Sequence, residues 1–201
     1  MKASSWLDEL AESSAGLAES ARRTLVAVEQ QGRGVGSGVV WAPGWVVTNA
    51  HVARSKRLRV RRGDQPECGA TLRAHDPRLD LAALELDADL GLPSAIGDST
   101  ALRVGEWVLA VGNPWGVSGG VTAGVVIDPA AGRDGGWLAL GLHLRPGHSG
   151  GAVVNARGEV VGVNAMMNGP DVGLAIAAGT VQGFLAEAGL LRKMSRLDRA
   201  A

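Results

Sequence analysis

The chain has 201 residues and is electrically balanced, with 20 lysines and arginines against 20 aspartates and glutamates. That length fits one domain or two small lobes, and it is enough to bury a core without disulfides or metals. The balanced charge excludes the overall basic field typical of nucleic-acid-binding proteins, and the single cysteine, Cys68, excludes an intramolecular disulfide and a cysteine-based zinc cluster.

The first 23 residues predict an amphipathic arm that precedes the rest of the protein. Apolar residues recur at helical spacing from Trp6 to Ala21 with acidic residues between them, and Ser4 or Ser5 fits the helix start. We predict a helix over residues 5–22, interrupted near Gly16 and packed on the body of the protein. A regulatory or oligomer-forming arm is the alternative.

The same segment lacks the continuous apolar core of a secretory signal peptide, and no stretch of the chain is long and apolar enough to span a bilayer. As written, the sequence therefore predicts a cytoplasmic protein. A chain trimmed of a leader would instead be periplasmic or secreted.

From residue 24 the pattern changes to short β-branched segments separated by glycine, proline and aspartate. Twelve such segments with tight connections are typical of an all-β fold. They suit two packed six-stranded antiparallel β-barrels that span residues 24–179 and meet near residues 92–100. The predicted strands are 24–30, 36–42, 45–52, 57–62, 68–75, 81–87, 107–112, 121–128, 136–144, 151–156, 159–167 and 171–178.

Residues 54–62 form the most basic stretch, in which arginines and a lysine alternate with apolar residues. We interpret this alternation as the solvated face of a strand. A weak anion or partner site is the alternative, and together with the glycine-rich turns it is the only support for a phosphate- or nucleic-acid-binding β protein.

The chain ends with a second predicted helix and tail, residues 180–201. Thr180 fits its N-cap, and Val181, Phe184 and Leu185 share one face.

The segment "RPGHSGGAVVN" places Gly147, Gly150 and Gly151 around Ser149. Glycine is favoured where the backbone must adopt angles that other residues avoid. The cluster predicts either a tight hairpin or a serine held in an unusual turn whose backbone N–H groups face a reacting oxygen.

Nucleophilic serine chemistry also needs a base and a group that orients the base. Of the four histidines, His51 follows the predicted strand "GWVVTNA", where a rigid scaffold can present it. Asp80 stands among apolar residues in "RLDLAALEL", and a buried carboxylate needs a hydrogen-bonding partner such as an imidazole. A turn aspartate that enters a strand is the alternative reading of Asp80.

The chain order His51, Asp80, Ser149 is that of chymotrypsin-type proteases, unlike that of subtilisins or α/β-hydrolases. It puts the base and the acid on the first predicted barrel and the nucleophile on the second.

Several motifs with these separations resemble the protease domain of the HtrA (DegP/DegS-like) trypsin-like serine proteases, from about Leu25 to the C-terminal helix. They are "GSGVVWAPGWVVTNAHV", "DPRLDLAALEL", "IGDSTALRVGEWVLAVGNPWG", "VTAGVV" and "RPGHSGGAVVNARGEVVGVNAM". The resemblance implies a chymotrypsin/trypsin-like double barrel with the active site between the barrels.

The resemblance also implies roles for individual residues. His51 would be the general base, Asp80 would orient it, and Ser149 would attack the scissile carbonyl. The oxyanion hole would be formed by the Gly147–His148–Ser149 segment, through the backbone N–H groups of Gly147 and Ser149.

The sequence departs from the family pattern at several points. His148 replaces the asparagine that usually precedes the serine, the loops before "GSGVV" and after "VTAGVV" are short, and no PDZ domain follows within the chain. His148 could touch the substrate or the leaving-group side of the cleft.

The specificity pocket is predicted by position. No acid stands at the start of the loop that leads to Ser149, so a preference for lysine or arginine is not expected. Flexible methionines favour loose selection of small or medium apolar side chains. The predicted substrate-binding residues are Leu144, Val163, Asn164, Ala165, Met166 and Met167.

The sequence thus predicts an HtrA-like serine endopeptidase that hydrolyses unfolded or misfolded polypeptides without a metal or organic cofactor. Neither nucleic acid nor a membrane span is expected, and the N-terminal segment could form a homotrimer. The alternative is a latent or inactive protease fold that acts as a binding or chaperone-like module.

Overall fold

The computed structural model describes residues 5–30, 33–88, 90–91 and 93–197. Residues 1–4 of the predicted arm, residue 92 at the predicted barrel junction and residues 198–201 of the predicted tail lie outside the described residues. The predicted domain boundaries at residues 24 and 179 stay predictions.

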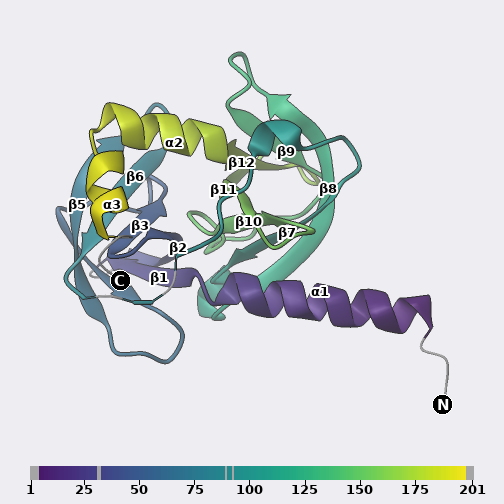
Figure 1. Cartoon of the computed structure of the whole chain (residues 1–201), viewed down its shortest axis with the longest axis horizontal. Coiled ribbons are helices and arrows are strands. Elements are labelled where there is room, and N and C mark those ends of the chain that lie inside the picture. Colours follow the sequence, from purple (N-terminus) through teal and green to yellow (C-terminus); the bar gives the residue numbers. More distant parts are fainter. Residues whose placement is uncertain (1–4, 31–32, 89, 92, 198–201) are drawn as a thin grey trace.

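Two closed antiparallel β-barrels of six strands each form the body of the protein (Figure 1). The strand order is β1-β2-β3-β6-β5-β4 in the first barrel and β10-β11-β12-β9-β8-β7 in the second, which is the same topology twice. The predicted all-β double barrel is confirmed. The strands are β1 Leu25–Gln30, β2 Arg33–Ala42, β3 Trp45–Thr48, β4 Arg57–Arg61, β5 Cys68–Asp76, β6 Leu81–Leu86, β7 Trp107–Gly112, β8 Gly120–Ala131, β9 Trp137–Leu140, β10 Ala152–Asn155, β11 Val160–Met167 and β12 Gly173–Ala177.

Apolar side chains fill three regions of this double barrel. One cluster fills the first barrel, with Val28 and Leu84 among its members, and another fills the second barrel, with Leu138 and Leu140. The third and largest joins strands of both barrels to the C-terminal helices. Burial of these side chains stabilises each barrel and holds the two together, because apolar area removed from water is the main favourable term in folding.

The basic stretch lies on β4, whose residues alternate between exposed and buried. Leu58 and Val60 enter the first core, whereas Arg57 and Arg59 form surface ion pairs with Asp87 and Glu67. This confirms the predicted solvated strand face.

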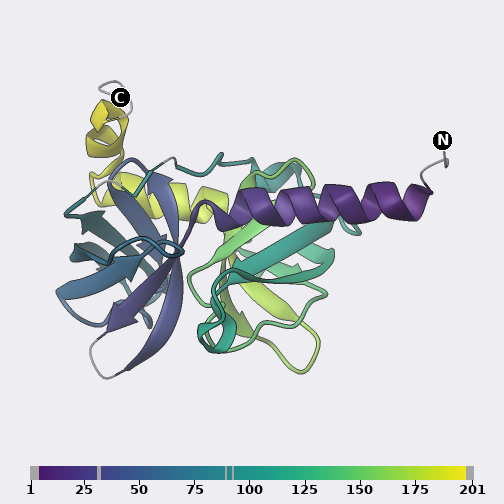
Figure 2. The same cartoon turned by 90° about the horizontal axis from the view of Figure 1, so that it is seen from below.

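The helix α1, Trp6–Arg22, begins with Ser5 as N-cap, and Ser5 and Asp8 form a capping box. The helix is continuous through Gly16, so the predicted interruption is wrong. Its C-terminal part reaches the second barrel while its N-terminal part extends beyond the body (Figures 1 and 2). Only part of the predicted packing is therefore made.

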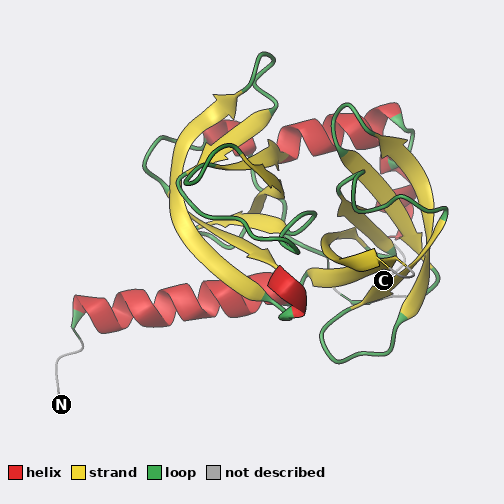
Figure 3. Ribbon diagram, turned by 180° about the vertical axis from the view of Figure 1, so that it is seen from behind, coloured by secondary structure: helices red, strands yellow, loops and turns green. Residues whose placement is uncertain are grey.

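The C-terminal segment forms two helices instead of the predicted one, α2 Ala178–Glu187 and α3 Leu191–Leu197. Gly189, with φ of +67°, separates them. Ala177 is the N-cap of α2, and Thr180 lies inside the helix with its hydroxyl donating to Gly136 O at 3.0 Å, so the predicted Thr180 cap is wrong. The helices cover one side of the double barrel (Figure 3).

Candidate active site

The ends of two paired strands bring His51 and Asp80 together. β3 and β6 are antiparallel neighbours with Thr48 opposite Ala82, so the residues after β3 meet the residue before β6. His51 Nδ1 lies 2.8 Å from Asp80 Oδ2 and 3.0 Å from Oδ1. Because a carboxylate only accepts hydrogen bonds, Nδ1 carries a proton, and in the neutral ring the lone pair is therefore on Nε2.

The Asp80 carboxylate is fixed on several sides. The backbone N–H of His51 donates to Asp80 Oδ1 at 3.0 Å, and Ala50 N–H and the Asn49 amide both donate to the Asp80 carbonyl. The Asp80 side chain is 15% exposed and the His51 side chain 39% exposed. The imidazole therefore stands on a partly buried, preorganised carboxylate with its far side open to solvent.

Ser149 lies between the two barrels. Its carbonyl accepts from the Ser37 N–H of β2 at 2.9 Å, and the next residue, Gly150, donates to the Asn164 carbonyl of β11 at 2.8 Å. The Ser149 hydroxyl donates to the Ala165 carbonyl at 3.0 Å. In this rotamer the hydroxyl proton is committed to Ala165, so transfer to an imidazole requires rotation of the side chain.

The turn before Ser149 has a defined peptide orientation. The Pro146 carbonyl accepts from Trp115 N–H at 2.9 Å, and the Gly147 carbonyl accepts from Ser37 Oγ at 2.7 Å and Asn113 N–H at 3.1 Å. Across a trans peptide bond the N–H points opposite to the preceding carbonyl. The Gly147 N–H therefore points away from Trp115, and it has no acceptor within the described part of the chain.

The N–H of Ser149 is also without an acceptor among the described residues, whereas His148 N–H donates to the Arg145 carbonyl at 2.9 Å. The N–H groups of Gly147 and Ser149 are therefore the two open donors of the turn. His148, which the sequence analysis included in the oxyanion segment, has no free N–H to contribute.

Two of the glycines in this turn are required by the backbone. Gly147 and Gly150 have φ of +102° and +84°. A Cβ at Gly147 would lie 2.1 Å from Asn113 O, and one at Gly150 would lie 2.1 Å from Ser37 O. This is the strained turn of the two readings that the glycine cluster allowed.

The two non-glycine residues with positive φ in the described chain, Asp80 at 55° and Trp115 at 50°, both belong to this region. Such backbone conformations are uncommon for residues with a side chain and concentrate at functional sites. Their coincidence here marks the junction of the barrels as the place where the fold stores strain.

The six residues predicted to bind substrate divide into four that lie at or next to the irregular part of β11 or contact it, and two within its regular part. In the first group, Ala165 faces Ser149 with its carbonyl, Met166 is 46% exposed, and Leu144 donates its N–H to Met167 Sδ at 3.0 Å. A register shift between Asn164 and Met166 takes Ala165 out of the regular ladder.

Val163 and Asn164 belong to the barrel wall instead. Val163 is fully buried in the core, and the Asn164 amide donates to the carbonyls of Val111 and Ala152. Val163 lies two residues and Asn164 one residue before Ala165, within the paired part of β11. Their place in the substrate-binding set stays a prediction.

The remaining histidines do not join His51. His75 contacts the Ala50 carbonyl and His143 the Pro170 carbonyl, both at the surface. His148 is buried beside Ser149, and burial lowers its pKa below the ordinary value for histidine. No group of three or more His, Cys, Asp or Glu side chains suited to a metal ion occurs among the described residues.

Sequence reasoning missed three residues that hold the turn: Ser37, Asn113 and Trp115. The Ser37 hydroxyl accepts from Asn113 N–H and from the Asn113 amide, each at 2.9 Å, while donating to Gly147. The guanidinium of Arg145 lies 5.8 Å from the Trp115 ring centre. The motifs "GSGVV" and "GNPWG" contain these residues, but only the tertiary structure shows what they touch.

Comparison with known proteins gives consistent matches. Residues 36–163 match the model of the trypsin-like peptidase domain. A probable periplasmic serine endoprotease DegP-like protein of Ectopseudomonas mendocina is 39% identical over 161 residues, which cover 74% of this chain and 33% of the relative. The periplasmic serine endoprotease DegP of Salmonella typhimurium is 34% identical over 175 residues, covering 79% and 36%. The chain thus spans about a third of the length of the curated relatives it matches.

A solved structure described as the HtrA-type protease AlgW with decapeptide has the same fold. It superposes with a TM-score of 0.78 at 25% sequence identity, covering 87% of this chain and 66% of that chain.

Proposed function

This chain belongs to the family of trypsin-like peptidase domains, and from that premise we propose that it is an HtrA-like serine endopeptidase whose catalytic residues are His51, Asp80 and Ser149. The observation that carries the proposal is the hydrogen bonding of the Asp80 carboxylate to both His51 Nδ1 and His51 N–H. It fixes the tautomer in which His51 Nε2 can accept a proton.

In the proposed mechanism the Ser149 hydroxyl turns from the Ala165 carbonyl towards His51 Nε2. Ser149 Oγ attacks the scissile carbonyl as His51 takes the proton, and Asp80 stabilises the imidazolium. The N–H groups of Gly147 and Ser149 donate to the oxyanion of the tetrahedral intermediate. His51 then protonates the leaving amine, and water hydrolyses the acyl-enzyme by the same steps.

The test is covalent labelling with a fluorophosphonate probe, which reacts only with an activated serine, together with digestion of casein. We expect the wild type to be labelled and to degrade casein, and Ser149→Ala to do neither while its circular dichroism spectrum stays unchanged. Equal labelling of the two proteins would contradict Ser149 as the nucleophile.

A second candidate function has support from one observation. The Ser149 hydroxyl bonds to Ala165 and not to His51 within the described residues, which favours a latent form or a binding module. Labelling that appears only after addition of a peptide or partner would establish the latent enzyme.

We further propose that substrates are unfolded or misfolded polypeptides cleaved after small or medium apolar residues. Met166 is exposed, directly after Ala165, whose carbonyl accepts from the Ser149 hydroxyl, while Leu144 and Met167 belong to the apolar core behind it. These residues are apolar and the methionines are adaptable, and an extended substrate would bind as an added strand. Mapping the cleavage sites of a denatured protein tests this, and a majority of cuts after lysine or arginine would contradict it.

Assembly and compartment complete the proposal. A homotrimer through the N-terminal segment predicts three times the monomer mass of 20.6 kDa in light scattering after gel filtration.

No described helix is long and apolar enough to cross a membrane. Cell fractionation decides between the cytoplasmic location predicted from the sequence as written and the periplasmic location in the names of the relatives.

A further inference from the structure

The mechanism makes no use of His148, the buried one of the four histidines. Its exposed fraction is 1%, and its ring packs against the end of β7. Gly112 makes room for it there, because a Cβ at Gly112 would lie 2.6 Å from His148 Cα and 3.2 Å from Cδ2. A histidine placed so tightly beside the nucleophile needs a physical explanation.

Two hydrogen bonds between His148 and Arg145 run in opposite directions. His148 N–H donates to the Arg145 carbonyl at 2.9 Å, which closes the turn through the backbone. Arg145 N–H donates to His148 Nδ1 at 3.1 Å, which closes it again through the side chain. Gly147 lies inside the turn that these two bonds close, so they act together with the bond from Trp115 N–H to the Pro146 carbonyl in setting where its N–H points.

The second of these bonds requires a neutral ring with its proton on Nε2. A histidine nitrogen accepts only when it carries no proton, so Nδ1 must be unprotonated. The opposite tautomer would direct Nδ1–H to the Arg145 carbonyl, 3.2 Å away, but would leave Arg145 N–H without its acceptor. Nε2 is buried and has no partner among the described residues, so the ring is held by Nδ1 alone.

We propose that His148 is a positioning residue whose neutral imidazole fastens the Arg145–His148 turn and thereby holds the Gly147 N–H ready for the oxyanion. This inference rests on the proposed serine endopeptidase function. It assigns the histidine a role through the backbone of the turn, and not through contact with substrate.

Protonation of His148 removes the lone pair at Nδ1, so Arg145 N–H loses its acceptor, and the new Nδ1–H can donate only to the Arg145 carbonyl 3.2 Å away, which already accepts from His148 N–H. The charged groups around the ring are Arg145 and His143, both of which disfavour a second positive charge, and the adjoining residues 111–113 at the end of β7 carry none. Burial is the larger cause of the lowered pKa of His148. The oxyanion site should therefore fail at acid pH in addition to any effect on His51.

The sign of the stability effect follows from the same shift. The unfolded chain binds the His148 proton at a higher pH than the folded chain, so between the two pKa values the unfolded state carries more protons. Above the pKa of the unfolded chain, about 6.5, the ring is neutral in both states, and the contribution of His148 to the free energy of unfolding is fully present. This contribution is lost as the pH falls towards the lower pKa that His148 has in the folded chain.

Two variants separate positioning from mere packing. His148→Asn keeps an acceptor oxygen close to the place of Nδ1 but does not titrate, whereas His148→Leu keeps a similar volume without an acceptor. The rate of fluorophosphonate labelling is measured from pH 5 to 8 at a temperature where circular dichroism shows each variant folded.

We expect His148→Asn to label within about threefold of the wild type at pH 8 and to lose less activity at acid pH. We expect His148→Leu to label at least about tenfold more slowly than the wild type at pH 8, since loss of a single oxyanion donor costs about 10²–10³-fold, and the difference should shrink as the pH falls and the wild-type ring is protonated. If folded His148→Leu protein is labelled at the wild-type rate, the inference is overturned and the proposed function stays intact. An acid limb unchanged in His148→Asn would overturn the protonation step.

A spectroscopic measurement tests the turn without reference to activity. Imidazole nitrogen resonances of the Ser149→Ala protein at pH 7 should show His148 neutral, with an acceptor Nδ1 and a protonated Nε2. The opposite tautomer or a charged ring would overturn the inference. If the wild type fails to label while this tautomer is observed, the proposed function fails and the turn stands.

Discussion

At the scale of single residues, the orientation of Asp80 decides what His51 can do. Asp80 adopts a left-handed backbone conformation with φ of 55°, which turns its carboxylate back onto the chain after β3. The two carboxylate oxygens then have separate tasks, because Oδ1 accepts from His51 N–H while Oδ2 has the shorter contact with Nδ1.

This division makes Asp80→Asn an informative substitution. The backbone N–H of His51 will keep an oxygen at Oδ1, so the amide nitrogen will face Nδ1 and force that atom to become an acceptor. Nε2 will then carry the proton and cannot act as the base. We expect labelling to slow by about 10⁴-fold with an unchanged fold. Asp87→Asn, at a surface ion pair with Arg57, is the control and should label normally.

A second residue-scale prediction concerns Gly150. The Gly150→Ala substitution combines a positive φ with a Cβ placed 2.1 Å from the Ser37 carbonyl, so we expect a loss of about 3 kcal/mol or more in unfolding free energy. Gly183→Ala is the matched control, because Gly183 lies in α2 with nothing within 4 Å of its added Cβ. That change should stabilise by up to about 1 kcal/mol. Urea denaturation measures both, and equal effects would contradict the backbone argument.

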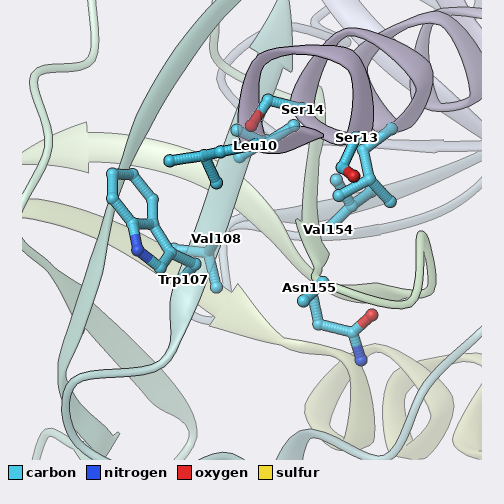
Figure 4. A pocket seen from close by; sticks show the side chains of 10 residues that line it. Leu10, Ser13, Ser14, Trp107, Val108, Val154 and Asn155 are labelled. Carbon is cyan, nitrogen blue, oxygen red and sulfur yellow. The ribbon is translucent and has the colours of Figure 1, made fainter. Parts of the chain in front are cut away.

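At the scale of elements, α1 is the segment whose packing the sequence predicts least well. Trp6, Leu7 and Leu10 are 72%, 56% and 47% exposed, although they belong to the predicted apolar face. The helix meets the second barrel at a groove of about 250 Å³ lined by α1, β7 and residues 154–156 (Figure 4). Leu10 and Leu17 line the groove on the helix side, opposite Trp107 and Val154.

The helix should therefore be anchored at its C-terminal half and not at its start. Leu17 packs partly buried against the main core cluster, so Leu17→Ala should lower the unfolding free energy by about 1–2 kcal/mol, at the low end for a core leucine. Leu7→Ala should change it by less than about 0.5 kcal/mol. Chemical denaturation of the two variants measures this, and a larger cost at Leu7 would mean that the exposed half is covered in solution.

At the scale of the whole molecule, the site exists only because the two barrels are joined correctly. The Ser37 hydroxyl comes from the first barrel and is fully buried. It accepts from Asn113 at the end of β7 and donates to Gly147 in the turn before Ser149. One side chain thus connects the barrel that carries His51 and Asp80 to the loop that carries the nucleophile.

We expect Ser37→Ala to lower the unfolding free energy by about 1–3 kcal/mol, because the buried N–H and amide of Asn113 each lose one of their two acceptors. It should also slow fluorophosphonate labelling, since the Gly147 carbonyl loses its contact at 2.7 Å. Ser99→Ala is the control: Ser99 is also buried but accepts from Gly179, far along the chain from this turn. Equal labelling rates in the two variants would contradict a link between the barrels and the turn.

The sequence by itself determined the elements and the chemistry of the residues. Short β-branched segments bounded by glycine, proline and aspartate located all twelve strands, because such segments with tight connections are typical of strands. Chain order and local motifs named His51, Asp80 and Ser149, because each stands beside a strand end or a glycine turn that is visible locally. The repeated topology of the two barrels left no comparable repeat in the residues, since many apolar sequences fill the same barrel.

Only the tertiary structure decided what those residues touch. Contacts between segments distant in the chain set the roles of Ser37, Asn113 and Trp115 and the burial of His148. They also place Val163 and Asn164 in the barrel wall and leave the N-terminal half of α1 exposed. Sequence periodicity shows which face of an element is apolar, but not whether another element covers it. The Gly147 carbonyl is likewise held by Ser37 on β2 and by Asn113, which directly follows β7, and these two residues lie next to the turn only when both barrels have closed.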